Sequence, residues 1–172
     1  MKISEYQKLA KVTCAELGDD KLNLSHMILG FYSEYNEIKS AERNMDLVNY
    51  GEELTDSQWY FANYCTYRNY AMQDFYEKMY ESRVSLEENL SKLADLVKKY
   101  IAYNKQIDID REIDLLKQIA YQFYDLYRAN DLNIYQCLQN NIDKLKARYG
   151  DKFSEHNAIN RNLDAERKEL EK

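Results

Sequence analysis

The fold is decided by two stretches, Glu34-Tyr-Asn-Glu37 and Glu53-Leu-Thr-Asp56-Ser-Gln-Trp59-Tyr60, with fifteen residues between Glu37 and Glu53. Residues three apart share one face of a helix, so each stretch predicts a helix that projects two carboxylates in the same direction. Two such helices packed side by side would bring four carboxylates together, and these need a cation. Oxygen ligands with little His or Cys nearby favour Mg²⁺, or alternatively Mn²⁺.

Composition extends this helical prediction to the whole chain. The 172 residues include no proline and four glycines, so the turns that a sheet protein requires have few residues to form them. We therefore expect one all-α domain, 1–172, built as a helical bundle. Its two halves would be 1–82, which carries the acidic pairs, and 83–172, which carries a basic C-terminal segment.

Capping residues and apolar spacing predict the individual helices. Ser4 with Gln7 and Ser85 with Glu88 resemble capping boxes, and Gly150 is a typical C-terminal cap. The expected helices cover residues 4–17, 25–44, 52–82, 85–103, 111–129 and 133–149, and a charged helix at 154–172 lies on a surface or a partner. The helices at 83–130 follow the plan of 28–66, which indicates a degenerate internal repeat with Asn89, Lys92, Leu115 and Gln118 at the positions of the four acids.

Charge and isolated residues restrict the classes of function. A net charge of −6 argues against binding a nucleic acid polymer, which requires a basic surface. Cys14, Cys65 and Cys137 lie far apart without a C-x-x-C pair, so buried free thiols in a reducing cytoplasm are expected. No apolar run is long enough for a membrane span or a signal peptide. His26 and His156 are isolated and are expected to be surface or capping residues without a catalytic role.

The acidic stretches resemble a known family. Gly30-Phe-Tyr-Ser-Glu34-Tyr-Asn-Glu37, followed by Glu52-Glu53-Leu-Thr-Asp56 and Trp59-Tyr60, is similar to the motifs of the MazG-like nucleoside triphosphate pyrophosphohydrolases. These enzymes belong to the all-α NTP pyrophosphatase superfamily, which includes dimeric dUTPases and dCTPases. Ser33, Asn36 and Thr55 stand where the family often has glycine, and all four carboxylates are kept.

Two further segments resemble the same family. Residues 93–103, which contain Lys98 and Lys99, look like the segment that usually follows the first acidic pair, but here they begin more than 50 residues after it. Residues 141–154 read Asn-Ile-Asp-Lys-Leu-Lys-Ala-Arg-Tyr-Gly-Asp-Lys-Phe-Ser and resemble the family's C-terminal motif, with Gly150 in place of a proline. Lys98 and Lys99 therefore lie on a different predicted helix, 85–103, from the acids.

The resemblance implies an activity and a set of site residues. Glu34, Glu37, Glu53 and Asp56 would bind Mg²⁺ and act in catalysis, and one of them or Glu52 would orient the attacking water. Lys98, Lys99, Lys144 and Arg148 would contact the phosphates, and the products would be a nucleoside monophosphate and pyrophosphate. Such proteins are common in bacteria and their phages, so a cytoplasmic enzyme of nucleotide metabolism, in the host cytoplasm if phage-encoded, is expected. The resemblance also implies a homodimer or a dimer of dimers.

Two alternatives remain open from the sequence. Besides the enzyme, the chain could be a catalytically weak or inactive member of the fold that binds a nucleotide or a protein. The other alternative is a purely structural helical dimer. Stoichiometric nucleotide binding without release of pyrophosphate would favour the first. Absence of a thermal shift with nucleotides would favour the second.

Overall fold

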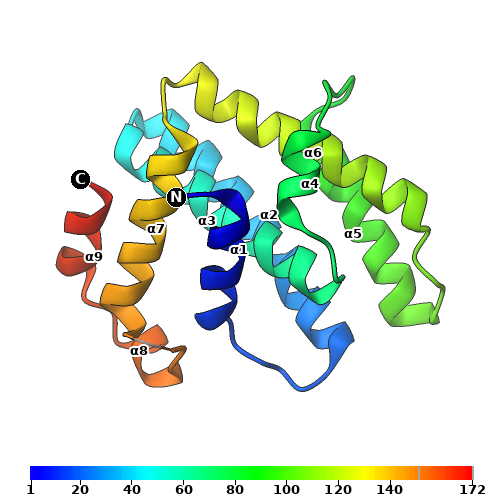
Figure 1. The fold of residues 1–172 in the computed structure, drawn as a ribbon, viewed down its shortest axis with the longest axis horizontal. Helices are drawn as coiled ribbons and strands as arrows, with labels where there is room; N and C mark the ends of the chain where they lie inside the picture. The colour runs from blue at the N-terminus through cyan, green and yellow to red at the C-terminus, as the bar shows by residue number, and fades with distance from the viewer. Residues whose placement is uncertain (151, 172) are drawn as a thin grey trace.

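The computed structural model describes residues 1–150 and 152–171, and within these ranges the chain forms nine helices and no strand. The all-α prediction is therefore confirmed. The helices, shown in Figure 1, are α1 (Ile3–Val12), α2 (Asp20–Asn44), α3 (Leu47–Tyr67), α4 (Met72–Glu77), α5 (Leu86–Tyr103), α6 (Ile109–Ala129), α7 (Ile134–Tyr149), α8 (Glu155–Ile159) and α9 (Leu163–Leu170).

The helices α2 and α3 form a tight antiparallel hairpin that holds both acidic pairs. The Asp19 side chain caps α2 by accepting from the backbone N–H groups of Lys21 and Leu22. The helix ends at Met45, whose φ of 54° is left-handed, and the next residue, Asp46, caps α3 by accepting from Asn49 N at 3.0 Å. Because only two residues connect them, α3 packs antiparallel to α2, and the acids of the two helices face each other.

A second hairpin, α5 and α6, completes a four-helix arrangement. α5 packs on α2, and α6 packs on α5, α4 and α3, which places this hairpin on one side of α2 and α3 in Figure 1. Aromatic side chains join three of the helices, because the ring centroid of Phe31 lies 6.1 Å from that of Phe61 and 6.4 Å from that of Phe123. The core formed by these rings sets the spacing between the acid-bearing helices and the second hairpin.

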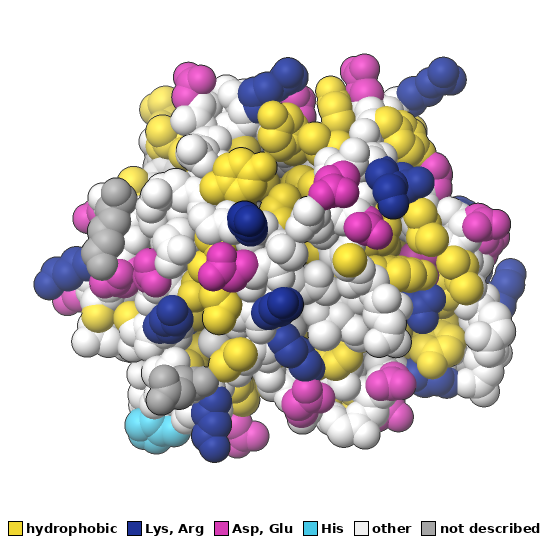
Figure 2. Space-filling view, viewed as in Figure 1, with side chains coloured by type: hydrophobic (Ala, Val, Ile, Leu, Met, Phe, Trp, Pro, Cys, Tyr) yellow, Lys and Arg dark blue, Asp and Glu magenta, His cyan; other side chains and the backbone are white. Residues whose placement is uncertain are grey.

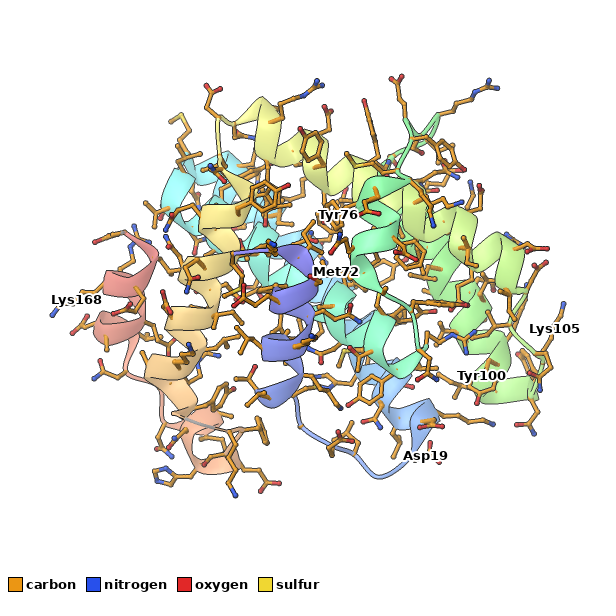
Figure 3. The ribbon with its side chains drawn as sticks, viewed as in Figure 1. Asp19, Met72, Tyr76, Tyr100, Lys105 and Lys168 are labelled. Atoms are coloured by element: carbon orange, nitrogen blue, oxygen red, sulfur yellow. The ribbon has the colours of Figure 1, made fainter. Side chains whose placement is uncertain are left out.

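The long helix predicted at 52–82 is wrong, because the chain leaves the helix after Tyr67 and restarts as α4. Asn69 adopts a left-handed φ of 57° at the break. The break is held by Glu112, which is fully buried on α6 and accepts two bonds from Arg68, at 2.8 and 2.7 Å, together with the hydroxyls of Tyr64 and Tyr70. Four donors satisfy this buried carboxylate. The corner is thereby tied to α6, and α4 brings Met72 and Tyr76 into the middle of the molecule (Figure 3).

The N-terminal helix, α1, lies against α3 and α7. The buried Tyr6 hydroxyl donates to Thr55 O at 3.2 Å and to Asn141 Oδ1 at 2.9 Å. The capping box expected from Ser4 and Gln7 is wrong, since α1 starts at Ile3 without a side-chain cap. Gln7 instead uses its amide in tertiary contacts: it donates to Tyr70 O and accepts from Met72 N.

Two predicted caps are confirmed, and the tail helix is corrected. Ser85 Oγ accepts from Glu88 N at the start of α5, and Gly150, with a φ of 68°, ends α7 with its N–H on Lys146 O. The single helix expected at 154–172 is two short helices, α8 and α9, and Lys172 lies outside the described residues. α9 packs along α7. Asn160 and Arg161 lie in the connection between α8 and α9.

The face seen in Figure 2 carries basic and acidic side chains interspersed with small apolar areas, as expected for a chain of modest net charge. None of the helices in the described part of the chain combines the length and apolarity needed to cross a bilayer. The prediction of free thiols is confirmed for all three cysteines; Cys14 and Cys65 are buried and Cys137 is partly buried.

Candidate metal centre

The hairpin geometry brings the acidic pairs to the same level. Counted from the connection at Met45 and Asp46, Glu37 and Glu53 lie about two helical turns away, and Glu34 and Asp56 about three. Carboxylate oxygens of Glu34, Glu37 and Glu53 lie within 4.8 Å of one another. Three of the four predicted ligands therefore converge without further movement. Glu53 is buried, Glu34 is partly buried and Glu37 is exposed.

Two acids of this group have raised pKa values, for which burial is the largest cause. Burial, followed by the charges of Asp56, Glu53 and Glu37, raises the pKa of Glu34 to about 9. Burial and the neighbouring carboxylates likewise raise the pKa of Glu53 to about 7, although a hydrogen bond with Glu34 opposes this increase. Burial and mutual repulsion thus both disfavour full ionisation of Glu34 and Glu53, and a bound cation would oppose both effects.

The fourth acid, Asp56, is engaged differently. Lys144 on α7 is fully buried and its Nζ donates to both oxygens of Asp56, at 2.7 and 2.6 Å, and to Glu52 Oε1 at 3.0 Å. Asn141 Nδ2 adds a bond of 2.6 Å to Asp56 Oδ1. Burial alone would lower the pKa of Lys144, but the charges of Asp56 and Glu52 raise it above the usual value. Lys144 thus provides the one positive charge in direct contact with Asp56 within the described residues.

The four residues predicted to contact phosphates are found in different places. Lys144 contacts acids, as just described, and Arg148, one turn later on α7, lines a cavity next to them. Lys98 and Lys99 pair with Asp95 on α5, at 2.7 and 2.5 Å, and do not line that cavity. The structure therefore does not bring Lys98 and Lys99 together with the acids, because α5 belongs to the hairpin on the other side of α2.

The cavity has a volume of about 760 Å³ and opens over the acids between α2, α3, α7 and the tail. Its walls differ in character. One is acidic, one is aromatic, and the third, from α7 and the tail, carries guanidinium groups. Residues of these walls are Glu34, Glu37, Glu52, Glu53, Asp56, His26, Trp59, Tyr60, Tyr149, Phe153, Arg148, Arg161, Glu166 and Arg167.

The aromatic wall is built on a close approach at Gly30. A Cβ at this position would lie 2.0 Å from Tyr60 Cε1, so the absence of a side chain lets the Tyr60 ring lie against α2. The Trp59 ring centroid is 5.0 Å from that of Tyr60, and its Nε1 donates to Thr13 Oγ1 at 2.9 Å. The indole is thereby fixed between α3 and the end of α1.

His26 is not the surface residue that the sequence indicated. It is partly buried, its ring centroid lies 5.7 Å from that of Tyr60, and its Nδ1 has no hydrogen-bond partner among the described residues. The spacing of His26, Gly30 and Glu34, four residues each, places all three on one face of α2, and this signal was available in the sequence. The tail residues Arg161 and Glu166 had no comparable signal.

At two of the four positions that the repeat alignment matches to acids, the second hairpin holds neutral amides, Asn89 and Gln118. Asn89 Nδ2 donates to Ser82 Oγ and Gln122 Oε1, both at 2.9 Å, and Ser82 Oγ donates to Gln118 Oε1 at 2.9 Å. Asn89 on α5 and Gln118 on α6 are therefore joined through the Ser82 hydroxyl, which shows that these two positions face each other across the second hairpin. Whether the hairpins share an origin stays a prediction.

Comparison of the chain with protein-family models, with curated proteins and with solved structures found no match. The functional interpretation therefore rests on the arrangement of the side chains.

Proposed function

We propose that this protein hydrolyses (deoxy)nucleoside triphosphates, or a related nucleotide, to a monophosphate and pyrophosphate in a Mg²⁺-dependent reaction, as the resemblance to MazG-like pyrophosphohydrolases implies. One observation carries the proposal: a cavity of nucleotide size, about 760 Å³, has crowded carboxylates on one wall and arginines on another. A polyphosphate is the ligand that needs both, because a cation must bridge it to the carboxylates while guanidinium groups bind its remaining oxygens.

The acids of this wall suit a hard divalent cation. Glu34, Glu37 and Glu53 offer carboxylate oxygens within 4.8 Å of one another, and burial with the neighbouring carboxylates raises the pKa values of Glu34 and Glu53, an effect that a cation would oppose. These three residues would hold the ion, and Asp56 would adjoin it with Lys144 balancing its charge. When bound, Mg²⁺ would neutralise charge on the polyphosphate and acidify a water molecule.

The other side chains then have separate tasks. Arg148 would bind the phosphates by its planar fork, and the rings of Trp59 and Tyr60 would cover the base or sugar and exclude water. Glu52 lines the cavity with one carboxylate oxygen held by Lys144, so it or a member of the acidic group would orient the water that cleaves the phosphoanhydride bond.

The experiment that tests this function is an incubation with a panel of NTPs and dNTPs, with Mg²⁺, with Mn²⁺ or with EDTA, followed by separation of the products. We expect monophosphate and pyrophosphate in equal amounts, dependent on the metal. Formation of diphosphate and phosphate, or no turnover with any nucleotide, would contradict the proposal. Glu37→Gln, which removes an exposed ligand charge, serves as the inactive control.

A second candidate, a binding protein without turnover, draws on one observation. Lys144 bonds both oxygens of Asp56, so three carboxylates rather than four are left for metal. Under this alternative, calorimetry would find one nucleotide per chain in the presence of Mg²⁺, while the product assay would find no pyrophosphate.

A further inference from the structure

The C-terminal tail places a buried carboxylate, that of Glu166, between two arginines in the cavity. Glu166 on α9 is 3% exposed, and its two oxygens face two guanidinium groups. Arg148 donates from Nε to Oε1 at 3.0 Å and from its terminal nitrogen to Oε2, and Arg161 donates to Oε2 at 2.6 Å. All three residues line the cavity that holds the acids.

The way the tail is attached makes this contact unusual. Glu166 is the one buried residue of α9 and α8 has none, while the apolar side chains of Ile159 and Leu163 are 81% and 62% exposed. A surface helix is ordinarily held by an apolar face. Here the buried group is charged. The contacts of Asn140 with Leu170 O, at 3.3 Å, and of Arg167 with Asp46, at 3.7 Å, are longer than the bonds that Glu166 accepts from Arg148 and from the terminal nitrogen of Arg161.

Two arginines around one carboxylate are a geometry suited to phosphate. A guanidinium binds carboxylate and phosphoryl oxygens through the same pair of parallel N–H groups, and a phosphoryl group carries more charge and a third oxygen. A phosphoryl group in this position would therefore form more bonds than Glu166 does. It would compete directly with the tail, because one set of donors cannot hold both.

We propose that Arg148 and Arg161 form a binding site for phosphoryl groups of a polyphosphate, and that Glu166 occupies this site until such a group displaces it and releases α9. The identity of the polyphosphate as a nucleoside triphosphate rests on the proposed function. The site itself requires only the chemistry of the phosphoryl group. The tail is then a built-in competitor whose removal from Arg148 accompanies binding.

The direct test is calorimetric titration of the full chain with inorganic tripolyphosphate. Glu166→Gln removes the competing charge and keeps the shape, so we expect its dissociation constant to fall by about tenfold or more relative to wild type, which corresponds to 1.4 kcal/mol. The matched control is Glu155→Gln, which makes the same charge change in an exposed residue of α8 that does not line the cavity. This control should bind as wild type does. Equal affinities for the two variants would overturn the proposal.

Arg161 is tested in the background of the first variant. Adding Arg161→Ala to Glu166→Gln should abolish the gain in affinity, because one arm of the site is lost. Retention of the full gain would remove Arg161 from the site and overturn the paired arrangement.

A measurement on the wild-type protein covers the case in which a variant fails to fold. Hydrogen exchange of the amides of residues 163–170 should become faster with saturating tripolyphosphate, since Glu166 is displaced and α9 loses its buried contact. Exchange that is unchanged or slower at saturation would overturn the proposal. Repeating the titration with a deoxynucleoside triphosphate and Mg²⁺ distinguishes a nucleotide from free polyphosphate as the ligand.

The outcomes also separate this inference from the proposed function. Faster exchange with tripolyphosphate, together with no hydrolysis of any nucleotide, would retain the arginine site and reject the enzyme. Hydrolysis to pyrophosphate, together with equal affinities of Glu166→Gln and Glu155→Gln, would retain the enzyme and reject the site.

Discussion

Replacing Lys144 by methionine removes the buried ammonium and keeps most of the side-chain volume. In the variant, Asp56 and Glu52 lose the cation that now lies 2.6 and 3.0 Å from their oxygens. Removing one partner of a buried ion pair costs about 3–5 kcal/mol. The side chains of Asp56 and Glu52 are 25% and 15% exposed, so water relieves part of this penalty and the expected loss is at the lower limit, about 3 kcal/mol.

The loss is measurable by thermal unfolding. In a chain of this size each kcal/mol shifts Tm by about 2–4 °C, so Lys144→Met should lower Tm by about 6–12 °C at neutral pH and low salt. Lys146→Met, two residues away on the exposed side of α7, removes the same charge and should leave Tm within about 2 °C of wild type. Added Mg²⁺ should recover part of the deficit, because a divalent cation also compensates the freed carboxylates.

Equal Tm values for the two lysine variants would refute this reasoning, since the buried ammonium would then contribute no more than a surface charge. A large loss that is the same with and without Mg²⁺ would instead locate the effect of Lys144 in packing and not in the charge of the acidic group.

Three further predictions concern the acidic and aromatic walls. Glu34 and Glu53 have raised pKa values of about 9 and about 7, so the native state holds protons that the unfolded chain releases, and the free energy of unfolding should fall as pH rises from about 4.5 to 9. Mg²⁺ should stabilise the protein more at pH 9 than at pH 6. Thermal melts in which Glu34→Gln leaves the dependence of Tm on pH unchanged would contradict this. Gly30→Ala should destabilise the protein by about 1–3 kcal/mol through its clash with Tyr60, whereas in a Tyr60→Ala background it should stabilise by up to about 1 kcal/mol. Denaturant titrations of wild type, the two single variants and the double variant measure both effects, and equal effects in the two backgrounds would contradict the clash. Glu37→Gln should abolish turnover with unchanged helical circular dichroism, and full activity would remove this residue from the site.

Local sequence patterns predicted the elements whose causes are local. The i,i+3 spacing of the acids, the Ser85 cap and the left-handed Gly150 depend on neighbours within one or two helical turns, and the structure confirms the two caps. The convergence of Glu34 with Glu53 also followed, because it needs only two helices and a short connection.

The remaining features depend on contacts between distant parts of the chain. The spacing of Ser4 and Gln7 indicated a capping box, but Gln7 accepts from the N–H of Met72, which lies 65 residues later and could not be paired with it from local sequence. The break after Tyr67 has no glycine or proline to mark it, and it is stabilised by Arg68 on Glu112, 44 residues later. Burial of Lys144 was equally invisible, since a lysine in a polar helix ordinarily remains in solvent.

The separation between Lys144 and its partners has a consequence for the order of folding during synthesis. Glu52 and Asp56 precede Lys144 by 92 and 88 residues, so a ribosome adding about 5–20 residues per second produces the acidic hairpin several seconds before the ammonium that balances it. During that interval the nascent hairpin carries its carboxylates without a counter-charge, and contacts between residues so far apart in sequence form late. If Mg²⁺ binds the mature site as proposed, the same ion would also balance the carboxylates of the emerging chain until Lys144 arrives.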